Sequence, residues 1–107
     1  NMPPLSMERL EQILRNIFPH IKPDALEQFC GLFLDLQLKA KNGEISTKAV
    51  DMRGLIGAIR LIHGGLEPIE AVEMGIINKS FDNFERELIS DIVMTRIPDT
   101  WKSGDVF

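Results

Sequence analysis

The stretch ISTKAVDMRGLIGAIRLIHGG, residues 45–65, decides the fold of this chain of 107 residues. Ser46 and Thr47 are N-cap residue types, because a side-chain oxygen can accept a hydrogen bond from the free N–H groups of a first helical turn. The closing pair Gly64-Gly65 suits a left-handed C-terminal cap. Between these signals the segment is apolar on most sides of a helix, which is typical of a helix buried among others. We therefore predict a central helix over residues 47–63.

The composition limits the classes of protein to which the chain can belong. With 44% hydrophobic residues, the chain can build one domain with a modest core. Its net charge of -4 argues against a nucleic-acid-binding surface. No run approaches the roughly 18 apolar residues of a membrane span, and no signal peptide is visible. Cys30 is the single cysteine and lies in an apolar run, so we expect a buried thiol and a cytoplasmic protein.

Apolar residues at helical spacing predict four more helices. No stretch of four or more residues alternates between apolar and polar with period two, so no sheet is predicted. The fold class is therefore all-α, a five-helix bundle with short connections. The predicted helices cover residues 5–18, 23–40, 47–63, 68–76 and 82–96.

Local signals mark the ends of these helices. Ser6 can cap the first helix, and Asn42-Gly43 can stop the second. Asp82 and Glu85 form an Asp-x-x-Glu capping box for the last helix. The apolar stripe predicted for that helix comprises Phe81, Phe84, Leu88, Ile89, Ile92 and Val93.

Three segments are expected along the chain. Residues 1–4 are a lead-in, because Asn1 before Met2 resembles the scar of a recombinant cleavage, and the chain is then a piece of a longer protein. Residues 5–98 form one helical domain. Residues 99–107 form a polar tail with one aromatic anchor, Trp101, and the sequence leaves open whether the tail docks or frays.

The sequence contains no recognisable catalytic motif. There is no GxxxxGK[ST] phosphate loop, no paired-cysteine or paired-histidine metal spacing, and no nucleophile set. His20 and His63 each sit at a predicted helix end, where a histidine is ordinary. The residues of the chain alone therefore predict neither an enzyme nor a metal site.

Three cations interrupt the central stretch. Lys48 would occupy the second position of the helix, where it either extends into solvent or strengthens the anion site that a helix N-terminus already forms. Arg53 and Arg60 lie seven residues apart on one helix face. They either form ion pairs with Asp51, Glu67 or the last helix, or they point at a ligand or partner.

Two glycines accompany these arginines. Gly54 and Gly57 each cost a helix roughly 1 kcal/mol relative to alanine. They are therefore expected to serve either close helix packing or the approach of another surface.

The order of these motifs resembles a known family. Ile45-Ser46-Thr47-Lys48-Ala49, then a hydrophobic helix, Gly64-Gly65 and Pro68-Ile69-Glu70-Ala71 resemble the C-terminal lid of MoxR/CbbQ-type AAA+ ATPases. In that family the pattern is Ser-(Thr/Pro)-Arg at a helix start, a helix ending in glycine, and a Pro-x-x-Ala helix. The stretch from Met74 through Pro98 looks like one MoxR-like branch. The resemblance covers roughly residues 8–98.

The resemblance implies a helical lid packed on a nucleotide-binding core of the same chain. The arginine of the Ser-x-Arg pattern is sensor 2, which reaches the γ-phosphate of ATP from the lid and couples hydrolysis to lid motion. Here that position is Lys48, so either Lys48 or Arg53 takes the role, beside Ser46 and Thr47. ATP and Mg²⁺ would bind in the longer protein, and none is expected on this chain alone.

The family also implies partners. Its members form rings, typically hexameric, that act as chaperone-like remodelers through ATP hydrolysis, and they work with von Willebrand factor A-domain proteins. An alternative reading of the residues is a free-standing helical protein-interaction module with no nucleotide role. A helical DNA-binding domain is disfavoured by the negative charge.

Overall fold

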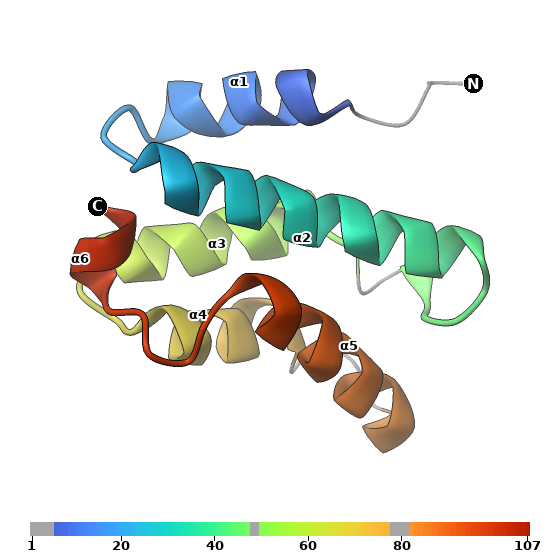
Figure 1. The fold of residues 1–107 in the computed structure, drawn as a ribbon. Helices are drawn as coiled ribbons and strands as arrows, with labels where there is room; N and C mark the ends of the chain where they lie inside the picture. The colour runs from blue at the N-terminus through green and yellow to red at the C-terminus, as the bar shows by residue number, and fades with distance from the viewer. Residues whose placement is uncertain (1–5, 48–49, 78–81) are drawn as a thin grey trace.

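The computed structural model describes residues 6–47, 50–77 and 82–107. These residues form six α-helices and no strand (Figure 1). The all-α prediction is therefore confirmed, with a sixth helix where a tail was expected. The helices are α1 (Met7–Ile17), α2 (Pro23–Lys41), α3 (Met52–His63), α4 (Pro68–Gly75), α5 (Asn83–Arg96) and α6 (Ser103–Val106).

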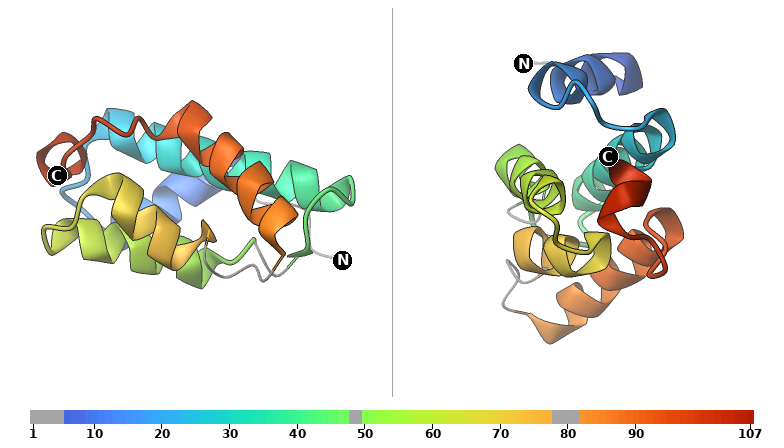
Figure 2. Two further views of the ribbon diagram at one scale, coloured as in Figure 1. Left: turned by 90° about the horizontal axis from the view of Figure 1, so that it is seen from below. Right: turned by 90° about the vertical axis from the view of Figure 1, so that its left-hand side faces the viewer.

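The helices are arranged around α2, the longest of them. α1 packs along α2 on one side, and α5 packs against α2 on another. α3 and α4 form an antiparallel pair whose packing is the most extensive between any two elements of the described chain. α6 lies at the end of the molecule where α2 begins and α3 finishes, in contact with both (Figure 2).

Every helix contributes to one hydrophobic core. On α3, the apolar residues Leu55, Ile59 and Ile62 are buried, whereas Met52 and Ile56 are only partly covered. The core is thus continuous across the bundle. Its largest fully buried side chains are Phe29, Leu10, Leu14, Leu26, Leu32, Leu36, Leu55, Ile59, Ile62, Ile89, Ile97 and Val72.

The start of the central helix differs from the prediction. α3 begins at Met52, and its cap is Asp51, whose Oδ1 accepts from the backbone N–H of Arg53 at 3.0 Å. A carboxylate at this position gains both the hydrogen bond and the attraction of the helix dipole. Ser46 and Thr47 are therefore not caps of α3. The backbone N–H of Ser46 instead donates to Oε1 of Glu85 on α5 at 3.0 Å.

The predicted glycine caps are confirmed. Gly65 follows α3 with a φ of 111°, and Gly43 follows α2 with a φ of 79°. Both values favour glycine, because a side chain would be strained there. The N–H of Leu66 donates to the carbonyl of Leu61 at 3.1 Å, which completes a Schellman closure of α3.

Asp82 caps the last long helix, but the predicted capping box with Glu85 is not formed, and the first turn of the helix is exposed. Oδ1 of Asp82 accepts from the N–H of Phe84 at 2.9 Å, whereas Oε1 of Glu85 accepts from the N–H of Ser46. Phe84 is 77% exposed, so its assignment to the core stripe was wrong. The buried residues of α5 begin only at Ile89, because the first turn extends beyond the part packed on α2. Phe81 lies outside the described residues.

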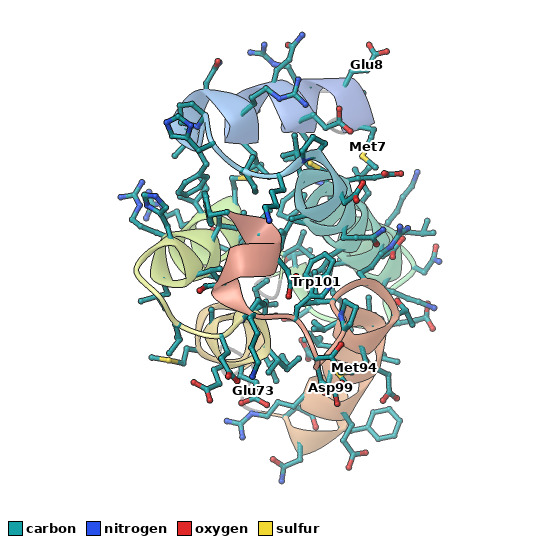
Figure 3. All side chains as sticks on the ribbon, turned by 60° about the vertical axis from the view of Figure 1, so that its left-hand side comes forward. Met7, Glu8, Glu73, Met94, Asp99 and Trp101 are labelled. Atoms are coloured by element: carbon teal, nitrogen blue, oxygen red, sulfur yellow. The ribbon has the colours of Figure 1, made fainter. Side chains whose placement is uncertain are left out.

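The segment expected as a tail docks on the bundle. Val106 is buried, and its carbonyl accepts from the backbone N–H of Lys22 at 2.8 Å. Trp101 is partly buried and lies between α6 and α5 near the centre of Figure 3. Nζ of Lys102 lies 2.7 Å from Oε1 of Glu67, which ties the tail to the start of α4. Of the two alternatives, docking is therefore the one observed.

Candidate functional site

A shallow groove between α3 and α4 contains the candidate residue Arg53. Its volume is about 390 Å³. Leu61 and Met74 line it with 40% and 59% of their surfaces exposed, and Arg53 lines it from the first turn of α3. The groove therefore joins an apolar surface to an exposed cation. Its lining residues are Arg53, Gly54, Gly57, Leu61, Met74 and Gly75.

The glycines of this groove have two different roles. A Cβ built on Gly75 would lie 2.8 Å from the carbonyl oxygen of Gly54 and 3.1 Å from Cβ of Ala58. Glycine is therefore needed for the close approach of α4 to α3. A Cβ on Gly57 would meet no atom within 4 Å. The contact of Gly54 with Gly75 therefore agrees with the expectation of close helix packing, whereas the approach of another surface at Gly57 stays a prediction.

Replacing Gly75 with alanine is expected to destabilise the fold by about 1–3 kcal/mol, because backbone must move to admit the new methyl group. The matched control is Gly57→Ala, which gains helix propensity and is expected to stabilise by up to about 1 kcal/mol. Thermal or urea denaturation of both variants measures the difference. Equal effects of the two substitutions would contradict the assigned helix contact.

The two arginines of α3 carry no ion pair to a carboxylate of the described chain. The ion pairs observed there join other residues: Lys102 to Glu67, Arg96 to Asp35 at 2.8 Å, and Lys39 to Glu44. The expected pairs of Arg53 or Arg60 with Asp51, Glu67 or α5 are therefore absent. Both arginine side chains are exposed, and a contact of either with a ligand or partner stays a prediction.

Two of the observed ion pairs raise the pKa of their cations. The hydrogen bond that Lys102 donates to Glu67 raises the pKa of Lys102, with the charge of the same carboxylate as a second cause. The hydrogen bond that Arg96 donates to Asp35 raises the pKa of Arg96, and this pair joins α2 to α5. These cations are thus held in their charged form and serve to tie elements together.

The structure separates the residues predicted to bind nucleotide. Ser46 and Thr47 are exposed, and Thr47 lines a different, mainly apolar pocket of about 520 Å³ beside the second half of α2. Arg53 lies at the α3–α4 groove. Lys48 lies outside the described residues. The second position of α3, predicted for Lys48, is held by Arg53.

Sequence reasoning missed the apolar side of the groove. At helical spacing, Leu61 lies on a different side of the central helix from Leu55, Ile59 and Ile62, and this spacing is the signal that it faces outward. Met74 and Gly75 carry no comparable signal, because their role depends on how α4 crosses α3.

Two other features, a metal site and a membrane span, were also looked for among the described residues and are absent there. Within them, no group of three or more His, Cys, Asp or Glu residues could hold a metal ion. None of their helices is both long enough and apolar enough to cross a membrane.

The described residues form an all-α bundle. In its α3–α4 groove, the exposed cation Arg53 lies beside the exposed apolar side chains of Leu61 and Met74. The chain is similar to the uncharacterized protein YojN of Bacillus subtilis (strain 168), at 30% identity over 95 residues. The similarity covers 89% of this chain and 31% of YojN, so the chain spans about a third of the length of this curated relative. No protein-family model matches the chain, and no solved structure matches it.

Proposed function

We propose that the chain is the C-terminal helical lid of a MoxR/CbbQ-type AAA+ ATPase, with Arg53 as its nucleotide sensor. The lid would pack on a nucleotide-binding core of the same longer chain and couple ATP hydrolysis to remodelling work. The proposal rests first on the motif order of the sequence, from Ile45 to Pro98. The relative YojN leaves room for such a core, because more than two thirds of it lies outside the similarity.

One observation carries the assignment of the sensor. Arg53 is an exposed arginine in the second position of α3, without an ion pair to any described carboxylate, and it lines an open groove. The helix dipole disfavours a cation there by about 0.3–1 kcal/mol. A negatively charged ligand reverses this cost, because it attracts both the free N–H groups and the guanidinium.

Arginine also suits the role better than Lys48. Its planar fork contacts two phosphate oxygens at once, whereas a lysine acts as a single point charge. The cation would meet charge that develops on the γ-phosphate during transfer, with Mg²⁺ beside it on the core. We therefore assign sensor 2 to Arg53, and to Lys48 at most a supporting contact.

The same proposal includes the partners of the longer protein. The groove residues Leu61 and Met74 would pack on the core, because exposed apolar surface beside a cation suits an interface around a charged ligand. The subunits would assemble into a hexameric ring, and a von Willebrand factor A-domain protein would act together with this ring.

In the longer protein, Arg53→Ala is expected to lower the ATPase rate about tenfold or more, because one hydrogen bond to a charged group contributes about 1.5–3 kcal/mol. Arg53→Lys should recover part of the rate, because it keeps the charge and loses the fork. Lys48→Ala should have a smaller effect. Steady-state ATP hydrolysis measures all three.

Arg15→Ala is the matched control, since it removes an exposed arginine from α1, away from the groove. Its rate should equal that of the unmodified protein. Unchanged turnover in both Arg53→Ala and Lys48→Ala would remove the sensor assignment.

The alternative function is a free-standing protein-interaction module without a nucleotide. Its supporting observation is Phe84, whose ring is 77% exposed on the first turn of α5 and could anchor a partner. The coding sequence upstream of Met2 separates the two functions. A Walker A motif there supports the lid, whereas a true start codon at that point would favour the module.

A further inference from the structure

The C-terminal segment, residues 99–107, crosses the end of the molecule where α2 begins and α3 finishes (Figure 2). The contact of α2 with α3 is less extensive than the contact of either helix with α6. By contrast, α1 and α5 pack directly on α2, and α4 packs directly on α3. The segment therefore links two groups of helices, α1, α2 and α5 in one group and α3 and α4 in the other.

Lys22, the residue before α2, holds one side of the C-terminal segment. Its Nζ donates to the carbonyl of Gly104 at 2.5 Å, and its backbone N–H donates to the carbonyl of Val106 at 2.8 Å. The side chain of Val106 is fully buried, and the ring of Phe107 lies 5.9 Å from the ring of Phe18. These contacts join the segment to the start of α2 and to the residue after α1.

The pair of helices α3 and α4 holds the other side of the segment. The ring of Phe107 lies 4.6 Å from the ring of His63, the last residue of α3. Nζ of Lys102 lies 2.7 Å from Oε1 of Glu67, the residue before α4. The side chains of this ion pair are 68% and 44% exposed, so water and salt weaken the attraction between them.

The attachment of the segment involves little buried surface. Among residues 99–107, all of which the structure describes, Val106 is the one fully buried side chain, and Trp101 and Phe107 are half-buried. Each ordered residue of the segment costs conformational entropy, which a few contacts must offset. The other five helices contribute all the remaining helical residues of the core. Detaching the segment therefore costs less free energy than unfolding the bundle.

We propose that residues 99–107 act as a releasable clasp, which detaches as a unit while α1–α5 stay packed. Release removes the link between the start of α2 and the end of α3. It also exposes Phe18 and the apolar site that Val106 fills. None of the residues of the segment lines the α3–α4 groove, so the clasp is independent of any nucleotide at Arg53.

The test compares two signals during urea unfolding of the chain of 107 residues. Trp101 is the single tryptophan of the chain and lies within the segment, so its fluorescence reports on docking. Far-UV circular dichroism reports on α1–α5, because α6 supplies only four helical residues. The fluorescence is expected to change at a lower urea concentration than the circular dichroism. Coincident transitions would overturn the proposal, because the segment would then belong to the same cooperative unit.

Val106→Asp places a charge at a buried position and is expected to detach the segment without denaturant. The emission of Trp101 should then match that of the unfolded chain, while the helix signal and its cooperative transition remain. The backbone N–H of Lys22 loses its acceptor, so its hydrogen exchange should accelerate about tenfold or more, whereas amides in the middle of α2 stay protected.

Thr100→Asp is the matched control, because it adds the same charge at an exposed residue of the same segment. It should leave the emission of Trp101 and the exchange of Lys22 unchanged. Loss of the helix signal in Val106→Asp would show that the bundle needs the docked segment and would overturn the proposal. Unchanged emission of Trp101 in that variant would overturn it as well.

Discussion

Replacing Ile59 with alanine is expected to lower the free energy of unfolding by about 2–5 kcal/mol. Ile59 is fully buried on α3, and it belongs to the core shared by all six helices of the described chain. The substitution removes apolar surface from the interior and leaves a cavity that the neighbouring helices can fill only in part. Urea denaturation followed by circular dichroism measures the loss.

Leu61→Ala is the matched control on the same helix. Leu61 is 40% exposed at the groove, so the smaller side chain leaves no closed cavity, and a loss below about 1 kcal/mol is expected. A loss well under 1 kcal/mol for Ile59→Ala as well would contradict the packing of α3 described above.

The thiol of Cys30 is expected to react with alkylating reagents far more slowly in the native protein than in the unfolded chain. Burial raises the pKa of Cys30 from 9.0 to about 12, and the negative charge of Glu11 acts in the same direction. Because the thiolate is the reactive form, the change in pKa alone makes it roughly a thousandfold scarcer near neutral pH. Steric protection on α2 slows the reaction further.

The raised pKa of Cys30 also determines the direction in which the stability of the fold changes with pH. Below about pH 9 both states hold the thiol, so the contribution of Cys30 to stability is fully present. As pH rises from 9.0 toward about 12, the unfolded chain ionises first, and this contribution is lost. Labelling rates with and without denaturant measure the protection. Native labelling as fast as that of a free thiol would contradict the burial of Cys30.

Sequence signals that depend on a few neighbouring atoms predicted the structure well. Ser6 caps α1 by accepting from Arg9 at 3.2 Å, and Gly43 and Gly65 close α2 and α3 as expected. Each of these choices is decided within one turn of backbone. The helix content and the class of fold followed from them and from the apolar spacing.

Choices between competing local signals could not be settled without tertiary contacts. Ser46 and Asp51 are both good caps, and the bond from Ser46 to Glu85 is visible only once α5 is in place. Because α3 begins at Met52, its second position is occupied by Arg53 and not by Lys48. The choice of cap in the sequence therefore also determined which cation was placed there as the candidate sensor. A pocket of about 240 Å³ lined in part by Arg60 and Phe107 was missed for a related reason, because Phe107 reaches it only when the C-terminal segment docks.

The docking of α6 has a consequence for how the chain acquires its structure during synthesis. The carbonyls of Gly104 and Val106 accept from the side chain and the backbone of Lys22, respectively. The partners are therefore more than 80 residues apart in sequence. This end of the bundle can therefore close only after α6 has been synthesised. The hairpin of α3 and α4 needs only local contacts and can form earlier, whereas Phe18 gains its ring contact with Phe107 only when α6 docks.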